Sequence, residues 1–292
     1  MYITGMGSYT GVILGLLAAC AWGAADLLAR FTGRGVGVLR TVFFTQTTAF
    51  VLISVWLVAS PGAFAVTAPW WAWAAALLGS AIVLSGTLCL YRAITVGVVS
   101  IVAPISASYG AVTMILSVAT GEVLGALAIG GLMVTVLGVA CTSAPERATG
   151  AAPAAATPGL GPAIYSAVAF GVGFWLIGAF AVPKLGWALP VWIYYGAGAL
   201  AAGAIALSRG YSLALPAPTL RALLLVHGTC GVLGYIAYST GLRTGHIAIV
   251  TVLSSLASGV TVLLARVVLD ERLTRRQWAG VGAILLGVAM LR

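Results

Sequence analysis

Long apolar runs, each close to the length that crosses a bilayer, follow one another along almost the entire chain. A helix needs roughly 20 apolar residues to span about 30 Å of hydrocarbon at ~1.5 Å per residue. Charged residues make up 7% of the 292 positions and apolar residues 62%, whereas a typical soluble domain is about 25% charged. So few charges cannot cover a soluble protein of this length. The sequence therefore predicts a multi-pass integral membrane protein and excludes a soluble enzyme, a secreted disulfide scaffold, a coiled coil and a disordered chain.

Ten apolar windows lie between charged residues and proline or glycine breaks, and each predicts a transmembrane helix. They cover residues 10–30, 37–59, 70–93, 97–119, 124–143, 161–182, 188–208, 219–242, 246–269 and 274–291. The 38 glycines favour packed helices over a barrel, because small residues let membrane helices approach closely and barrel strands alternate polar and apolar positions. The predicted fold class is an all-α integral membrane protein with ten transmembrane helices.

One stretch has the composition of a linker rather than of a membrane segment. Ala144 to Gly159 reads APERATGAAPAAATPG, rich in Ala, Pro, Gly and Thr, with the charged pair Glu146-Arg147. Such a composition is typical of a flexible connection. We therefore predict a first five-helix repeat over residues 1–143, a linker over 144–160 and a second five-helix repeat over 161–292.

The two halves match in order when the sequence is shifted by about 148 residues. An aromatic–glycine pair in the first helix of each half then aligns, Trp22-Gly23 with Phe170-Gly171. Further matches in the fourth and fifth helices are Gly97, Ile101, Ser106, Val112 and Thr113 with Gly245, Ile249, Ser254, Val260 and Thr261, and Gly131, Gly138, Val139 and Ala140 with Gly280, Gly287, Val288 and Ala289. Glu122 aligns with Asp270, or with Glu271 after one more residue of shift.

An odd number of helices in each half has a consequence for topology. The second half must enter the membrane from the side opposite to the first, so the two halves form an inverted repeat. This is a transporter architecture, and its substrate site lies at the interface of the two repeats.

Two stretches resemble the ten-helix drug/metabolite transporter superfamily of the EamA type. One runs from Tyr91 through Pro104 to Glu122 (YRAITVGVVSIVAP…GEVL), and the other from Gly241 to Gly287 (GLRTGHIAIV…LDERLTRRQWAGVGAILLG). An acid, then Leu, then a glycine-rich last helix is typical of this family in both halves. The sequence departs from the family in having Asp270-Glu271 where Gly-Glu is more usual, and Val252 at the counterpart of Pro104.

The resemblance implies a single-chain carrier of small metabolites that works by alternating access. It favours a secondary active transporter that exports an amino acid-like or amphiphilic compound across the plasma (cytoplasmic) membrane. Import or exchange within the same superfamily is the alternative, and a membrane-embedded enzyme or receptor is a further one.

Motifs of other membrane protein classes are missing from the sequence. It contains no HExxH, no pair of membrane aspartates and no GxxxxGK[ST], and its one lysine, Lys184, falls in a predicted loop. Four cysteines lie in apolar stretches without a CxxC pattern: Cys20, Cys89, Cys141 and Cys230. We therefore expect no enzyme activity, no cofactor and no metal. The expected partners are a small-molecule substrate and the lipid bilayer, with protons as the candidate coupling ion, no nucleic acid, and a monomeric chain.

Two titratable residues lie inside predicted spans. Asp26 is the only acid well inside one, and a charge in hydrocarbon is costly. Arg30 lies four residues later, so the two residues can pair on one helical face. The alternative is an acid that takes up a proton or contacts a substrate amine in a cavity. His227 can change its charge near neutral pH, or it can be a buried neutral histidine bonded to a neighbouring helix.

Proline, hydroxyl and aromatic side chains complete the candidate site. Pro104 frees a backbone carbonyl inside a span, which is tolerated where neighbouring helices or a water-lined cavity compensate. Serine hydroxyls near it and on the counterpart helix either line a cavity or hold helices together. Aromatic rings can form walls for an apolar or aromatic substrate. The candidate substrate-binding residues are therefore Trp22, Asp26, Tyr91, Pro104, Ser106, Tyr109, Trp175, His227, Tyr235, Tyr238, Ser254 and Ser255.

Two criteria for the orientation of the chain disagree. The loops between helices 1–2, 3–4, 5–6, 7–8 and 9–10 hold most of the basic residues, so the positive-inside rule places both termini outside the cytoplasm. Members of the resembled family usually have cytoplasmic termini. The sequence is compatible with both orientations.

Overall fold

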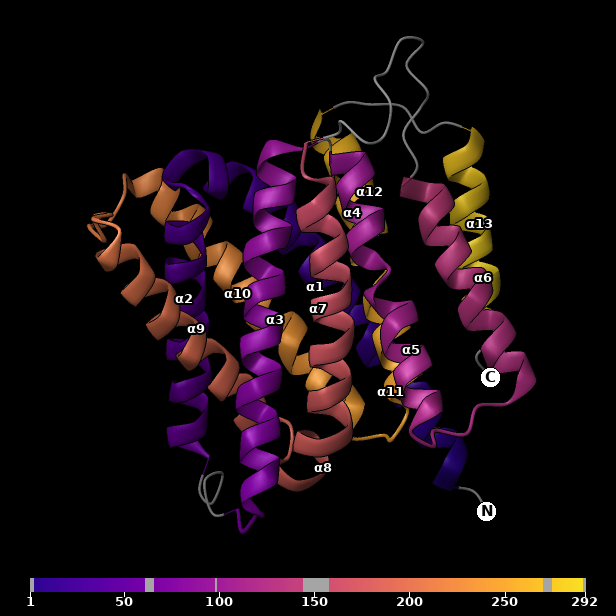
Figure 1. Ribbon diagram of the computed structural model, residues 1–292. Coiled ribbons are helices and arrows are strands. Elements are labelled where there is room, and N and C mark those ends of the chain that lie inside the picture. The colour runs from indigo at the N-terminus through magenta and orange to yellow at the C-terminus, as the bar shows by residue number, and fades with distance from the viewer. Residues whose placement is uncertain (1–2, 61–65, 98, 144–157, 270–274, 291–292) are drawn as a thin grey trace.

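The computed structural model describes residues 3–60, 66–97, 99–143, 158–269 and 275–290, and within these ranges the chain forms helices and no strands (Figure 1). The first half contains α1 (Ile3–Val36), α2 (Val38–Ala59), α3 (Trp70–Val96), α4 (Val99–Ala107), α5 (Tyr109–Ala119) and α6 (Ala126–Ser143). The second contains α7 (Leu160–Leu176), the π-helix η2 (Ile177–Ala181), α8 (Val182–Leu185), α9 (Ala188–Ser208), α10 (Pro218–Leu242), α11 (Ile247–Ser254), α12 (Ala257–Leu269) and α13 (Arg275–Ala289). Helices satisfy their own backbone N–H and C=O groups, as hydrocarbon requires.

Six helical segments in the described ranges are long and apolar enough to cross a membrane. They are Tyr9–Val36, Val38–Ala59, Trp70–Val96, Leu160–Leu185, Ala188–Ser208 and Pro218–Leu242. Shorter apolar helices cover Ile105–Ala119, Ala126–Gly138 and Ile247–Thr261. The prediction of a multi-pass helical membrane protein is confirmed, and the count of ten spans stays a prediction. Most of the predicted linker, residues 144–157, lies outside the described residues.

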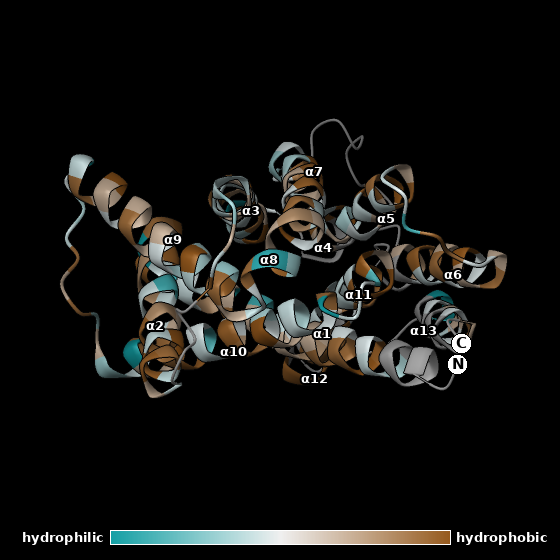
Figure 2. Cartoon of the chain, turned by 90° about the horizontal axis from the view of Figure 1, so that it is seen from below, coloured by the Kyte–Doolittle hydropathy of each residue, from teal (hydrophilic) through white to brown (hydrophobic). Residues whose placement is uncertain are grey.

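The helices are arranged so that equivalent elements of the two halves pack together. Viewed along the helices, α2 and α9 form one edge of the bundle and α6 and α13 the opposite edge (Figure 2). Between these edges, α1 packs against α10, and α3 packs against α7. The repeat relates α1 to α7 and α3 to α10. The contact between α1 and α10 is therefore equivalent to the contact between α7 and α3.

The fourth span of each half is broken. The first break separates α4 from α5 at Ser108, whose N–H bonds to the carbonyl of Ile105 at 3.2 Å. The second separates α11 from α12, where the N–H of Leu256 bonds to the carbonyl of Leu253, also at 3.2 Å. The two breaks are 148 residues apart, as the repeat alignment requires. Because Val252 replaces proline in the second half, a proline at this position is not necessary for the break.

The first helix of each half crosses the fourth span of the other half at a glycine. Gly23 of α1 faces α12, where an added Cβ would lie 2.6 Å from the Cβ of Val260. Gly171 of α7 faces α5, where an added Cβ would overlap Val112. No larger side chain fits at either crossing without displacing the partner helix.

A threonine hydrogen bond accompanies each glycine crossing. The hydroxyl of Thr113 donates to the carbonyl of Gly171 at 2.9 Å. The hydroxyl of Thr261 shares its one proton between the carbonyl of Gly23 at 3.1 Å and that of Ala257 in its own helix at 2.8 Å. Each bond to a glycine carbonyl joins one half to the other, and the two are related by the 148-residue shift. The aligned residues are therefore structurally equivalent, as the sequence comparison predicts.

Replacing Gly171 with alanine is expected to lower the free energy of unfolding by about 1–3 kcal/mol, because the added methyl group overpacks the crossing. The readout is the thermal midpoint of the detergent-purified protein. Gly161→Ala is the control, since nothing lies within 4 Å of an added Cβ there. Adding Val112→Gly, which removes the overlapping Cβ, should restore part of the loss. Equal midpoints for the two glycine variants would contradict the close crossing.

Glu122 of the first half binds the start of a helix of the second half. It lies in the loop between α5 and α6, and its two carboxylate oxygens accept the N–H of Ala248 at 3.2 and 3.1 Å. Ala248 is in the first turn of α11, where the helix dipole favours a negative charge. Burial raises the pKa of the Glu122 carboxyl, and the bond from Ala248 opposes that shift. The matching acids, Asp270 and Glu271, lie outside the described residues.

Glu122→Gln is expected to change how stability depends on pH. A pKa raised by folding contributes stability below the unfolded value of about 4.3, and that contribution is lost as pH rises through the folded pKa. Glutamine keeps an oxygen acceptor but does not titrate in this range. The thermal midpoint of the wild type minus that of the variant should therefore fall as pH rises from roughly 4.5 to 8. A constant difference would argue against a buried carboxyl.

Basic side chains flank the helix junctions at one end of the molecule. The α1–α2 and α3–α4 junctions lie at the same end, the upper one in Figure 1, and Arg34 and Arg40 flank the first of them. The opposite end holds α8, which contains Lys184. The positive-inside rule predicts that the upper end faces the cytoplasm.

Candidate functional site

A cavity of about 110 Å³ lies between the two halves of the protein. Helices α1, α2, α3 and α5 of the first half line it together with α7, α9, α10 and α12 of the second. Its aromatic lining residues are Trp22, Tyr91, Tyr109, Phe170, Phe174, Tyr194, Tyr195 and Tyr235. The cavity therefore has the position that an inverted-repeat transporter gives its substrate site.

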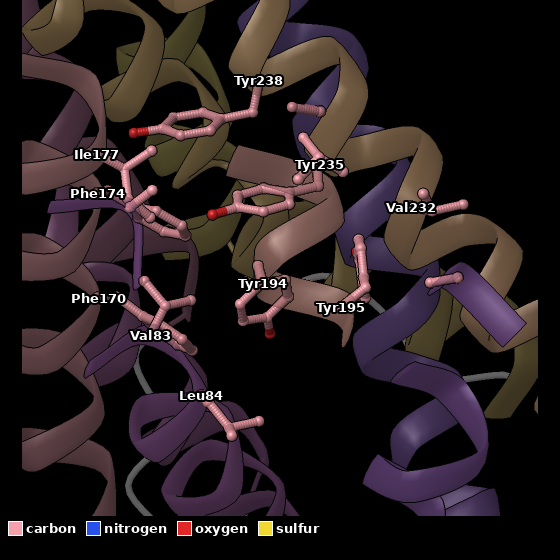
Figure 3. Close-up of a cluster of buried hydrophobic side chains, with 14 of the residues drawn as sticks. Val83, Leu84, Phe170, Phe174, Ile177, Tyr194, Tyr195, Val232, Tyr235 and Tyr238 are labelled. Carbon is pink, nitrogen blue, oxygen red and sulfur yellow. The ribbon is translucent and has the colours of Figure 1, made fainter. Parts of the chain in front are cut away.

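Stacked rings from both halves make one wall of the cavity. Trp22 and Phe174 stack with centroids 5.5 Å apart and planes 10° apart, and Phe170 stacks on Phe174 at 5.7 Å. Figure 3 shows Phe170 and Phe174 on one side of the central space, with Tyr194 and Tyr235 facing them. The ring faces carry negative electrostatic potential, so this wall is apolar and attracts cations.

The indole of Trp22 is fixed in place by α10. Its Nε1 donates to the carbonyl of Gly231 at 3.2 Å. A side chain at position 234 would collide with the indole, because a Cβ added to Gly234 would be 2.5 Å from Trp22 Cδ1. The glycine therefore lets α10 approach the ring closely enough to hold it.

His227 connects α10 to two helices of the first half. Its Nε2 lies 2.8 Å from the hydroxyl oxygen of Tyr91, and its Nδ1 lies 3.2 Å from Oγ1 of Thr32. Thr32 donates its single hydroxyl proton to the carbonyl of Leu28 at 2.9 Å. Oγ1 of Thr32 therefore accepts a hydrogen bond from Nδ1–H. In the neutral ring, Nε2 accepts a hydrogen bond from the hydroxyl of Tyr91. This arrangement matches the interpretation of His227 as a neutral histidine bonded to neighbouring helices.

Asp26 lines the cavity without a neutralising partner. Among the described residues it forms neither an ion pair nor a hydrogen bond, so the pairing with Arg30 that the sequence spacing allows is not formed. Its carboxyl interacts electrostatically with the hydroxyl groups of Tyr91 and Tyr109. An unpaired acid inside a membrane protein is costly, and such acids mark functional sites.

Among the described residues, two further polar side chains that line the cavity have an unsatisfied atom, Nε2 of Gln46 and the hydroxyl of Tyr235. Tyr235 lines the cavity and is 2% exposed, and its hydroxyl has no hydrogen-bond partner among the described residues. Leaving a buried hydroxyl unpaired costs about 1–3 kcal/mol. A ligand in the cavity could supply the missing partner.

Half of the predicted site residues line the cavity: Trp22, Asp26, Tyr91, Tyr109, His227 and Tyr235. Two more touch this group from behind. Tyr238 packs on Trp22 with centroids 5.4 Å apart and hydrogen bonds to Thr251 at 2.9 Å. Ser254 hydrogen bonds to the hydroxyl of Tyr109 at 3.1 Å. These two residues support the cavity wall rather than face the space.

The other predicted residues lie away from the cavity. Ser106 hydrogen bonds to Ser166 of α7 at 2.7 Å, so it joins two helices. Trp175 donates to the hydroxyl of Thr120 at 3.1 Å. Ser255 donates to a carbonyl within its own helix segment. Pro104 falls in α4, and its side chain lies outside the described part of the chain.

Several lining residues are missing from the sequence prediction: Thr45, Gln46, Thr87, Phe170, Phe174, Tyr194 and Tyr195. Phe170 has a usable signal, because it aligns with Trp22 in the repeat and both residues line the same cavity. Tyr194-Tyr195 is an adjacent aromatic pair within a span. The remaining residues have no distinguishing pattern in the sequence.

The comparisons with known proteins agree with this architecture. The model of the EamA-like transporter family matches residues 9–144 and again residues 157–292. One solved crystal structure matches with a TM-score of 0.72 over 97% of this chain and 96% of that one. The identity is 17%, so this likeness shows the fold alone. No curated protein matches the chain. With both halves matched by the family model, the chain belongs to the EamA-like transporter family, within the drug/metabolite transporter superfamily.

Proposed function

We propose that this protein is a secondary active transporter that exports a small organic molecule by alternating access. The observation that carries the proposal is the cavity between the two inverted halves, which contains the one acid found well inside a predicted span. Ligands bind at this interface in inverted-repeat transporters, and one repeat rocks against the other around the site.

The helix crossings support two alternating arrangements. Each half contributes its first helix to a crossing with the fourth span of the other half, and the two crossings have the same glycine and threonine contacts. The helix packing at one crossing can therefore be exchanged for the packing at the other crossing, because equivalent residues make both. Residues without a counterpart, such as the His227–Tyr91 pair, then distinguish the two states.

Asp26 is the proposed coupling residue. An acid with no cation beside it can gain or lose a proton without breaking an ion pair. Its electrostatic contact with Tyr91 links it to the bond between Tyr91 and His227. Protonation of Asp26 in α1 would therefore alter the hydrogen bond between Tyr91 of α3 and His227 of α10.

Transport itself is tested by comparing metabolites in cells that overexpress the protein with those in cells that lack it. For an exporter, at least one small organic compound should accumulate in the medium and fall inside the overexpressing cells. That compound should then show counterflow in proteoliposomes containing the purified protein. The opposite distribution would indicate import, and the absence of flux for every member of a broad metabolite panel would rule out a carrier.

Proton coupling is tested with Asp26→Asn in the same proteoliposomes. The variant should lose the stimulation of flux by a pH gradient and keep counterflow exchange, because asparagine does not titrate. Tyr165→Phe, on the exposed surface of α7, is the control, because it leaves every acid in place. If Asp26→Asn responds to the gradient as the wild type does, Asp26 is not the coupling acid.

A further inference from the structure

The charges that line the cavity restrict what it can hold. Among the described residues that line it, Asp26 is the one acid, and none is a lysine or an arginine. An anionic ligand would meet a carboxylate without any neutralising cation. A zwitterion would leave its own carboxylate unpaired in a low-dielectric space, which costs several kcal/mol. A ligand with a single positive charge would pair with Asp26 and leave no charge unmatched.

The aromatic wall favours the same kind of ligand. The rings of Trp22, Phe170 and Phe174 form one stack, and all three residues line the cavity. Aromatic faces attract organic cations, and cages of aromatic rings are a recurrent way to bind ammonium groups. The same faces stack against an apolar or aromatic body, so one wall can contact both parts of the molecule.

The size of the cavity and its hydrogen-bonding groups further restrict the chemical class of the ligand. A volume of about 110 Å³ is of the order of the ~150 Å³ apolar cavity that holds benzene, so the space fits one ring. The unpartnered hydroxyl of Tyr235 can accept a hydrogen bond from an N–H group, which a primary ammonium has and a quaternary ammonium lacks.

We propose that the cavity binds a small aromatic primary amine in its protonated form, with the ammonium group beside Asp26 and the ring against the stack of Trp22, Phe170 and Phe174. This proposal rests on the transport function proposed above, because it names the substrate class of the same site. It separates this protein from a carrier of amino acids, whose carboxylate would find no lysine or arginine among the described lining residues.

Three probes with the same ring test the charge requirement: phenethylamine, phenylalanine and 3-phenylpropionate. Binding to the detergent-purified, full-length protein is measured by isothermal titration calorimetry. Phenethylamine should bind, phenylalanine should bind at least about tenfold more weakly, and 3-phenylpropionate more weakly still, because an unpaired buried charge costs more than 1.4 kcal/mol. Equal or tighter binding of phenylalanine or 3-phenylpropionate overturns the proposal.

Variants then locate the bound amine. Asp26→Asn should weaken phenethylamine binding at least about tenfold, and Phe174→Leu, which removes a ring face, should weaken it by a smaller factor. Glu122→Gln should leave the affinity unchanged, as should Tyr165→Phe on the exposed surface of α7. Unchanged affinity in Asp26→Asn overturns the proposal. Because the probe series uses the wild type, it decides the question even when a variant fails to fold.

Counterflow separates this proposal from the transport function. Proteoliposomes that exchange an amino acid or an organic anion, while phenethylamine neither binds nor competes, would retain the transporter and overturn the amine site. Phenethylamine binding that depends on Asp26, without counterflow of any amine, would retain the amine site and overturn transport. Counterflow of phenethylamine that is lost in Asp26→Asn supports both.

Discussion

The structure depends on two close helix crossings, one on each side of the cavity. Lipid tails are as apolar as the side chains of the helices, so hydrophobic burial does not drive helices together in a bilayer. Close approach and hydrogen bonds have to supply that attraction. At Gly23 and Gly171 the absence of a Cβ allows the approach, and a threonine from the partner helix bonds to the glycine carbonyl. Both crossings join different halves, so they hold the cavity walls together.

Many polar groups elsewhere in the bundle follow the same rule, whereas the one acid of the cavity does not. Hydroxyl groups pair across helices, as in Tyr238 with Thr251 and Ser106 with Ser166. His227 has a partner at each ring nitrogen. Asp26 lacks such a partner among the described residues. An unpaired acid inside a membrane protein is costly, so a ligand or a proton in the cavity is the best explanation for Asp26.

The sequence predicts the architecture better than it predicts the site. Hydropathy identifies the helices because the bilayer fixes their length and excludes charge, and the window 188–208 coincides with α9. The 148-residue shift identifies the crossings because they are made by the same residue types in both halves. Cavity residues such as Thr45 and Gln46 are not predicted, since lining a space imposes no periodicity on a span. The sequence does not separate the serines that join helices from those that line a cavity, because both have the same sequence pattern.

The bond between Glu122 and Ala248 has a mechanical consequence. The loop that leads into α6 is attached to the first turn of α11, although the two segments belong to different halves. Any rearrangement that separates the halves at this end has to remove a half-buried carboxyl group from a helix terminus. The loop and α11 are therefore joined across the two halves by this bond. A rocking motion would pivot about this attachment rather than pass through it.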